Sequence, residues 1–220
     1  MTGLSAAIIV LAGGRATRMD GRDKPLLPFA GATLLDHVLG ALEGQGSPIL
    51  LSANGDPARF ARFGLPILPD PVPDQPGPLA GLLAGLEWLE LHAPATRWLV
   101  TVPADTPFLP RDLVARLHSA RHAAGAVLAC AESAGRAHPV VALWPVELAP
   151  ELRHALVRHG MRRVGAFAAR HTLVRARFEA DPDPFANLNT PAELAAADVV
   201  RRQGQGYPLP IPRQGTSAEN

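Results

Sequence analysis

SAAIIVLAGG, at residues 5–14, is the stretch of sequence that decides the fold class. After Ser5 it is a continuous apolar run with β-branched side chains, which is typical of a strand buried on both faces of a sheet. Two glycines end the run, so a tight loop is expected there. In an open parallel sheet this loop lies at the carboxyl edge of the strands, where ligands bind. The segment therefore predicts an α/β fold with a ligand site directly after its first strand.

The hydrophobic pattern of the remaining chain agrees with that fold class. Strand-like and helix-like segments alternate, which implies a single α/β domain with a mostly parallel, twisted, Rossmann-like sheet and helices on both faces. The strands on either side of Gly135 could pair antiparallel. We expect strands at 5–11, 48–53, 66–68, 97–102, 126–131, 139–143 and 173–176, and helices at 33–42, 57–63, 79–91, 111–121, 147–158, 163–170 and from Thr190-Pro191 onward, with Thr190 as the cap.

Length and composition limit the possible classes of protein. The chain has 220 residues, of which 47% are apolar and 19% charged, so it can bury a sizeable core. Its formal net charge of +1 argues against nucleic-acid binding driven by bulk charge. Residues 1–200 are expected to form one domain, and residues 201–220, which are rich in Gln, Gly and Pro, a mobile tail.

The single cysteine and the lack of a recognisable targeting signal both favour a cytoplasmic location. Cys130 is the only cysteine, so no internal disulfide can form. The apolar runs fall short of the roughly 18 residues that a membrane-spanning helix needs, and the first residues lack the pattern of a signal peptide. We therefore expect a cytoplasmic protein that binds no membrane.

The loop after the first strand carries glycines and cations together. Gly13 and Gly14 allow backbone amides to approach phosphate oxygens, and Arg15, Arg18 and Lys24 add positive charge. The spacing matches neither the dinucleotide fingerprint nor the P-loop. A glycine turn with solvated arginines is the alternative, but the density of cations favours a polyphosphate site. Lys24 is the only lysine among 21 basic residues, so it needs an explanation.

Two aspartates are expected at the same edge of the sheet. Asp105 follows the strand at 97–102, and its carboxylate suits Mg²⁺, which proteins usually hold with one or two carboxylates together with substrate phosphates. It could equally cap a turn. Asp70 ends a third strand and could accept a hydrogen bond from a base or ribose.

Together these residues predict transfer of a nucleotidyl group. Amides and cations would hold a triphosphate bridged by a metal, and a phosphate oxygen would attack the α-phosphorus while pyrophosphate leaves. Such a reaction depends on positioning and charge neutralisation more than on a covalent nucleophile. The sequence shows no obvious Ser-His-Asp or Cys-His set, in agreement with that chemistry.

Five motifs resemble the molybdenum cofactor guanylyltransferase family, usually called MobA, over about residues 6–194. The first is shared with many nucleotidyltransferases, whereas the combination is much more specific. The motifs are Leu11-Ala-Gly-Gly with Arg18-Met19 and Asp23-Lys24, Pro76-Gly-Pro-Leu-Ala-Gly81, Asp105-Thr-Pro107, His138-Pro139 and Asn187-Leu-Asn-Thr-Pro191.

The resemblance implies a nucleotide-diphospho-sugar transferase type of fold and a specific reaction. GMP would pass from Mg-GTP to the terminal phosphate of molybdopterin in its molybdenum-bearing form, and pyrophosphate would be released. The implied protein partners are other enzymes of cofactor biosynthesis and acceptor molybdoenzymes. A cytidylyltransferase acting on the same pterin, which usually has Leu-Ala-Ala-Gly in the first motif, and a regulatory protein that has lost turnover are the alternatives.

The resemblance also implies roles for individual residues. Lys24, Arg18 and Asp105 would be catalytic, with Asp105 as the ligand of Mg²⁺. Asn187, Asn189 and His138 are candidates for the pterin side, although the two asparagines could equally tie the turn before the last helix. The nucleotide would be contacted by Leu11, Ala12, Gly13, Gly14, Lys24, Asn54, Asp70 and Asp105.

Some residues depart from the family or carry no role. Asp20-Gly21 stands where the family usually has Gly-Gly, which puts a carboxylate beside the phosphate loop. Ser52 stands at one of two positions where an asparagine is expected. His118 and His122 have helical i, i+4 spacing but no third ligand nearby, so we interpret them as surface histidines.

Overall fold

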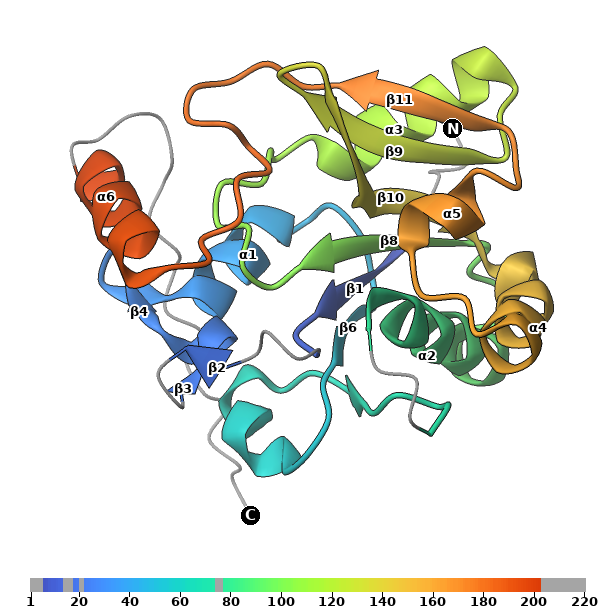
Figure 1. The fold of residues 1–220 in the computed structure, drawn as a ribbon, viewed down its shortest axis with the longest axis horizontal. Helices are drawn as coiled ribbons and strands as arrows, with labels where there is room; N and C mark the ends of the chain where they lie inside the picture. The colour runs from blue at the N-terminus through green and yellow to red at the C-terminus, as the bar shows by residue number, and fades with distance from the viewer. Residues whose placement is uncertain (1–5, 14–17, 20–21, 74–76, 203–220) are drawn as a thin grey trace.

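The structure is a computed structural model, and it describes residues 6–13, 18–19, 22–73 and 77–202. The expected tail at 201–220 lies outside them apart from its first two residues. A seven-stranded sheet forms the centre of the molecule, with the strand order β11-β9-β10-β8-β1-β6-β7 (Figure 1). Its strands are β1 (Ala7–Leu11), β6 (Ile49–Ser52), β7 (Ile67–Leu68), β8 (Trp98–Pro103), β9 (Leu128–Ser133), β10 (Arg136–Pro145) and β11 (Leu173–Arg177).

The sheet is mostly parallel, as the alternation of segments predicts. β10 alone runs against its neighbours, because it pairs antiparallel with both β8 and β9, and the other pairs are parallel. The expected antiparallel pairing across Gly135 is therefore confirmed. Because β10 is reversed, its first residues lie at the same edge of the sheet as the last residues of β8 and β9.

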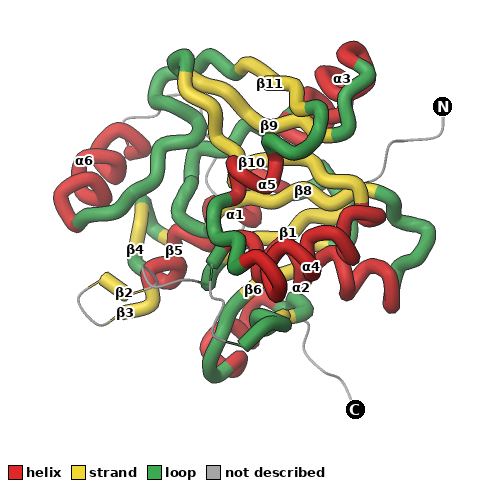
Figure 2. The backbone as a smooth tube through the Cα atoms, turned by 45° about the vertical axis from the view of Figure 1, so that its right-hand side comes forward, coloured by secondary structure: helices red, strands yellow, loops and turns green. Residues whose placement is uncertain are grey.

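Helices cover both faces of the sheet. Alternate residues of β1 point to opposite faces: Ile8 and Val10 belong to one apolar core, and Ala7 and Ile9 to the other. Figures 1 and 2 show α2 and α4 stacked on the face opposite to α1 and α3. The helices of the first face are α1 (Leu34–Leu42) and α3 (Leu113–Ala124), and those of the second are α2 (Pro78–His92), α4 (Ala149–His159) and α5 (Val164–Ala168).

A last helix, α6 (Pro191–Arg202), packs beside the sheet rather than on it (Figure 2). Leu194 and Ala197 of α6 contact a small apolar cluster that includes Phe29 and Leu188. Thr190 caps the helix as predicted, since its Oγ1 accepts the Glu193 amide at 3.1 Å and Glu193 accepts the Thr190 amide at 3.0 Å.

Short elements complete the chain. The predicted helix at 57–63 is a 3-10 helix, and two small ribbons before α1 were not expected from the sequence. The ribbons pair β2 (Arg18–Met19) with β3 (Arg22–Asp23) and β4 (Pro28–Phe29) with β5 (Ala32–Thr33), and the 3-10 helices are η1 (Lys24–Leu26), η2 (Pro57–Phe63) and η3 (Val146–Leu148). Within the described residues, no helix is long and apolar enough to cross a membrane.

One interpretation of the sequence is wrong. His118 is not a surface histidine, because only 3% of the residue is exposed and its ring lies edge-on to Trp98 with centroids 5.6 Å apart. His118 lies on the buried face of α3 together with Val114 and Leu117. The helical spacing of these three residues could have predicted that His118 is buried. His122 is exposed, as expected.

Candidate functional site

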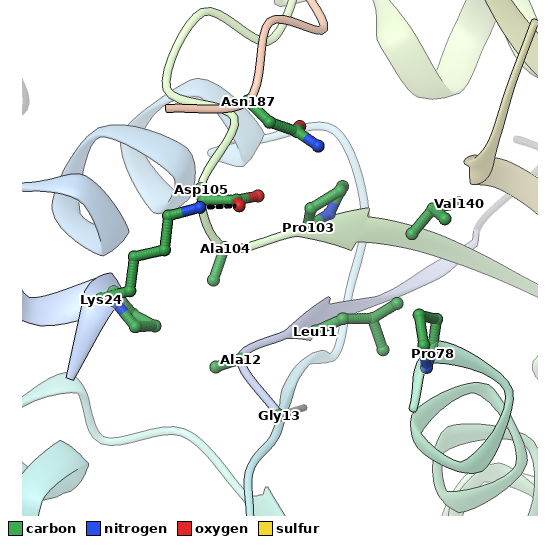
Figure 3. A pocket seen from close by; sticks show the side chains of 11 residues that line it. Leu11, Ala12, Gly13, Lys24, Pro78, Pro103, Ala104, Asp105, Val140 and Asn187 are labelled. Atoms are coloured by element: carbon green, nitrogen blue, oxygen red, sulfur yellow. Dashed lines mark hydrogen bonds and ion pairs between the residues drawn. The ribbon is translucent and has the colours of Figure 1, made fainter. Parts of the chain in front are cut away.

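A cavity of about 210 Å³ opens at the carboxyl edge of the sheet, where β1 and β8 end (Figure 3). Its walls come from segments far apart in the sequence. They are Leu11, Ala12 and Gly13 at the end of β1, Lys24 and Pro25 of η1, Pro78 of α2, Pro103, Ala104 and Asp105 at the end of β8, Val140 of β10, and Asn187 before α6. The structure therefore brings six of the residues predicted for the site around one space: Leu11, Ala12, Gly13, Lys24, Asp105 and Asn187.

The lone lysine is buried in this wall and is bound by two predicted site residues. Lys24 is 5% exposed, and its Nζ donates to Oδ2 of Asp105 at 2.5 Å and to Oδ1 of Asn189 at 2.7 Å. Figure 3 shows the Lys24 and Asp105 side chains pointing toward each other. A buried ammonium requires a charged or polar partner, and here the Asp105 carboxylate and the Asn189 amide oxygen are those partners. The position therefore favours a cationic side chain.

Backbone hydrogen bonds fix the loop that carries Asp105. The Ala104 amide donates to the Leu11 carbonyl at 3.1 Å, and the buried Thr106 hydroxyl donates to the Pro103 carbonyl at 3.1 Å. The loop is thus tied both to β1 and to its own strand. The Asp105 side chain itself is held at the cavity by Lys24.

The segment before α6 closes the other side of the lysine. The Leu188 amide donates to the Asp105 carbonyl at 3.2 Å, and the Leu188 side chain is 5% exposed in the cluster under α6. Asn189 therefore reaches Lys24 from an anchored backbone. The sequence left two alternatives for this asparagine, pterin contact or a turn tie. The structure shows the turn tie, because Asn189 Nδ2 donates to the Asn187 carbonyl at 3.5 Å, and in addition the Asn189 Oδ1 accepts from Lys24.

Asn54 and Asp70 form a second polar pair, outside the cavity wall. Asn54 Nδ2 donates to Asp70 Oδ2 at 2.7 Å, and the Asp70 amide donates to Asn54 Oδ1 at 2.9 Å. Burial raises the pKa of Asp70, and the hydrogen bond from Asn54 opposes that rise. A Cβ built on Gly13 would lie 3.9 Å from Asn54 Nδ2, so the pair adjoins the glycine loop.

Arg59 was missed by the sequence analysis. It lies in η2, donates to the Asn54 carbonyl at 2.5 Å and pairs with Asp23, next to Lys24, at 3.5 Å. This arginine connects the polar pair of Asn54 and Asp70 to the segment that carries the lysine. No motif marks it, because a lone arginine in a short helix has no distinctive pattern.

Glycines let α2 approach the site closely. A Cβ on Gly81 would lie 2.6 Å from the Ser52 Oγ and 2.7 Å from a methyl carbon of Leu11. Gly77 has φ 141°, a conformation that other residues rarely adopt. The predicted Pro-Gly-Pro-Leu-Ala-Gly motif therefore brings Pro78 to the cavity wall.

His138 lies in β10, two residues before Val140 of the wall, and is not itself in the wall. Its Nε2 is 2.8 Å from the Ser133 Oγ, which donates to Asp183 at 2.7 Å. The structure thus assembles serine, histidine and aspartate side chains where the sequence showed no such set. The order is not that of a nucleophilic triad, because the serine proton goes to the aspartate and not to the histidine.

Several predicted residues lie outside what the structure describes. Gly14, Arg15, Asp20, Gly21 and Pro76 belong to the segments that are left out, and only the backbone of Arg18 is described, in β2.

Asp105 is the candidate ligand for a metal ion at this cavity. Among the described residues there is no cluster of three or more His, Cys, Asp or Glu side chains that could hold a metal ion. The Asp105 carboxylate, whose side chain is 21% exposed at the cavity, offers a hard oxygen ligand. This fits Mg²⁺, which takes few protein ligands when phosphates and water supply the rest.

Comparison with known proteins agrees with the geometry. Residues 8–174 match the model of the MobA-like NTP transferase domain. A molybdenum cofactor guanylyltransferase of Rhodopseudomonas palustris strain HaA2 is 54% identical over 191 residues, which cover 86% of this chain and 89% of that protein. Another, of Mesorhizobium japonicum, is 50% identical over 193 residues, 86% of this chain and 92% of that protein.

Solved structures show the same fold at low sequence identity. Molybdopterin-guanine dinucleotide biosynthesis protein A from Archaeoglobus fulgidus superposes with a TM-score of 0.68 at 22% identity, over 90% of this chain and all of that one. CMP:2-keto-3-deoxy-manno-octonic acid synthetase, complexed with CTP, has a TM-score of 0.66 at 14% identity, over 90% of this chain and 98% of that one.

Proposed function

Because this chain belongs to the MobA-like NTP transferase family, in which its relatives of about 50% identity are molybdenum cofactor guanylyltransferases, we propose that it transfers GMP from GTP to the terminal phosphate of molybdopterin. Pyrophosphate is the other product. The observation that supports this most directly is the buried Lys24, held by Asp105 and Asn189 beside the loop after β1.

The chain's own residues supply position and charge. The backbone of Leu11, Ala12 and Gly13 borders the cavity, where amides can meet phosphate oxygens, and Lys24 supplies a fixed positive charge. No covalent intermediate is needed: a phosphate oxygen of the pterin forms a bond to the α-phosphorus as the bond to the β-phosphate oxygen breaks. Charge that develops on the leaving pyrophosphate is stabilised by groups already in place.

We assign Asp105 as the ligand of Mg²⁺. The ion would neutralise phosphate charge beside a site that already holds one carboxylate and one ammonium. Asp105 keeps its position without the ion, because Lys24 and the backbone bonds of its loop hold it.

The remaining predicted residues divide between the two substrates. The pair of Asn54 and Asp70 lies beside Gly13, so we assign it to the nucleotide. Asn187 borders the cavity and His138 lies two residues from its wall, so we assign both to the pterin. Asn189 holds the lysine and reaches substrate through it. A cytoplasmic location remains part of this proposal, as do the partner enzymes.

Assays with three different nucleotides test the proposed function. Purified protein with molybdopterin, Mg²⁺ and GTP, CTP or ATP should release pyrophosphate with GTP. Release with CTP alone would establish the cytidylyltransferase instead, and binding of nucleotide without release would establish a regulatory protein. Gly13 in Leu-Ala-Gly-Gly and the relatives' names both favour GTP.

A further inference from the structure

Three side chains at the carboxyl edge of the sheet form a hydrogen-bonded series, of which only His138 has been assigned to a substrate above. Ser133 ends β9, and its Oγ lies 2.8 Å from Nε2 of His138 in β10. The same Oγ donates to Oδ1 of Asp183 at 2.7 Å. We refer to Ser133, His138 and Asp183 as the serine relay.

The backbone holds the relay in place. A turn at Ala134 and Gly135, with φ 46° and 74°, joins β9 to β10 so that Ser133 is opposite Arg136. His138 is two residues beyond Arg136 and is therefore a diagonal neighbour of Ser133 on the same face. Ser133 is 4% exposed, so its hydroxyl needs hydrogen-bond partners within the protein rather than bulk water.

A second segment fixes the other members. The Phe185 amide donates to Asp183 Oδ1 at 3.0 Å, and the Phe185 ring lies 5.0 Å from the His138 ring, between centroids. Phe185 itself is 3% exposed. The aspartate and the imidazole are thus both braced by one buried phenylalanine.

Counting protons determines the state of the imidazole. A serine hydroxyl has one proton, and here it goes to a carboxylate, which can only accept. The Ser133 Oγ must then accept from His138, so Nε2 carries the ring proton. In the neutral ring the lone pair is left on Nδ1, for which the described residues provide no hydrogen bond.

Burial favours that neutral ring. Burial is the largest cause of the lowered pKa of His138, and the positive charge of Arg136 lowers that pKa further. The negative charge of Asp183 opposes the shift. A neutral Nδ1 can accept a hydrogen bond but cannot donate one. The imidazole therefore discriminates between donors and acceptors on whatever binds beside it.

The relay lies beside the segment that leads to the cavity wall. The His138 ring is 5.0 Å from the Phe185 ring, between centroids, and Asn187 of the wall follows Phe185 by two residues. Val140 of the wall follows His138 by two residues in β10, but the register of β10 shifts between His138 and Ala142, and Val140 packs against the other apolar core. From this placement we infer that Ser133 and Asp183 are positioning residues, which hold His138 in the Nε2-protonated tautomer so that its Nδ1 accepts a hydrogen bond from an N–H group of the pterin. The inference rests on the proposed function, through the pterin as second substrate.

The first test is spectroscopic and needs no substrate. In protein labelled with ¹⁵N-histidine, long-range ¹H–¹⁵N correlation distinguishes the two neutral tautomers of His138, with the His138→Phe variant identifying its signals. We expect the Nε2-protonated form near pH 7 and a mixture in Ser133→Ala. Wild-type protein with the Nδ1-protonated form would overturn the inference, whatever the variants do.

The second test separates the pterin from the nucleotide. Ser133→Ala should raise the KM for molybdopterin about 3- to 10-fold, the value of one hydrogen bond, while kcat and the KM for GTP change less than about twofold. Ser133→Thr keeps the hydroxyl and should restore the wild-type values. Ser119→Ala, at an exposed serine of α3, is the matched control.

The outcomes distinguish this inference from the proposed function. Wild-type protein that releases no pyrophosphate from GTP and molybdopterin overturns the proposed function, and the inference with it. An active enzyme whose Ser133→Ala variant keeps the wild-type KM for molybdopterin overturns the relay alone.

Discussion

At the scale of single residues, Lys24 shows why one lysine remains in a chain that otherwise uses arginine. Its side chain is 6% exposed, and one nitrogen bonds to both Asp105 and Asn189. An ammonium is a compact point charge with a flexible stem, whereas a guanidinium is a planar fork that needs a larger space and different partners. The surrounding structure is therefore built for lysine.

Lys24→Arg should lower kcat with GTP by about 100-fold or more, as expected when a preorganised charge is misplaced. The circular dichroism spectrum should stay that of the parent, which shows that the fold is retained. The converse exchange Arg158→Lys, at an exposed position of α4, serves as control and should leave the rate unchanged. Wild-type turnover in Lys24→Arg would make the single lysine an accident of composition.

Asp105 forms an ion pair with Lys24, and its proposed second role is to bind Mg²⁺; different substitutions separate the two. Asp105→Asn keeps an oxygen for Lys24 but removes the charge, so Mg²⁺-dependent turnover should fall by about 100-fold with the fold retained. Asp105→Ala should also lower the free energy of unfolding by about 2–3 kcal/mol, because it leaves a buried ammonium without its carboxylate.

Pyrophosphate release and urea unfolding measure these two effects. Asp112→Asn, an exposed aspartate before α3, is the control and should change neither. Full activity of Asp105→Asn at saturating Mg²⁺ would place the metal ligand elsewhere.

At the scale of elements, the site depends on how closely α2 packs against the ends of β1 and β6. Gly81→Ala should lower the free energy of unfolding by about 1–3 kcal/mol, because the new methyl would overlap Ser52 and Leu11. Leu11 borders the cavity, so the KM for GTP should rise as well.

Gly165→Ala in α5 provides the comparison. Its Cβ would meet Pro139 at 3.5 Å, an ordinary contact, so stability should not fall. Equal effects of the two substitutions in chemical denaturation would contradict the packing argument.

The elements also show what a sequence can predict. β1, β6 and β8 are apolar runs apart from Ser52 and Thr101. α1 is capped by Thr33, whose hydroxyl accepts the Asp36 amide at 3.3 Å, so these elements have local signals. β2 to β5 are two-residue strands, too short for any period to be visible. In the folded chain β2 pairs with β3 and β4 pairs with β5.

For the site, the sequence predicts which loops meet but not which side chains bond. The placement of Lys24 and Asp105 follows from parallel strands that end at one edge. The hydrogen bond from Lys24 to Asn189 joins residues 165 positions apart. The two hydrogen bonds between Asn54 and Asp70 depend on side-chain rotamers. Neither is encoded in any spacing.

At the scale of the whole molecule, His118 links protonation to global stability. Both ring nitrogens are buried without a hydrogen bond among the described residues. Burial, with a smaller contribution from Arg121, lowers the pKa of His118 from 6.5 to about 4. The unfolded chain then binds a proton that the native protein does not, so stability falls as the pH drops from about 6.5 to about 4.

His118→Leu should remove this loss, which is on the order of 3 kcal/mol across the whole interval. His122→Leu on the same helix is the matched control, because that residue is exposed and its removal should leave the pH profile unchanged. Urea unfolding at a series of pH values measures the difference. Parallel profiles for wild-type protein and His118→Leu would show that acid sensitivity has another origin.

The reversed strand β10 also bears on the order in which the chain folds. β10 is joined to β9 by a two-residue turn, and such a short loop loses little conformational entropy when it closes. Isolated hairpins form within microseconds. The ion pair of Lys24 with Asp105 spans 81 positions, and it requires β1 to find β8 first. The hairpin that carries Ser133 and His138 can therefore exist before the cavity with Lys24 and Asp105 does, and recovery of enzyme activity should be among the last events of refolding.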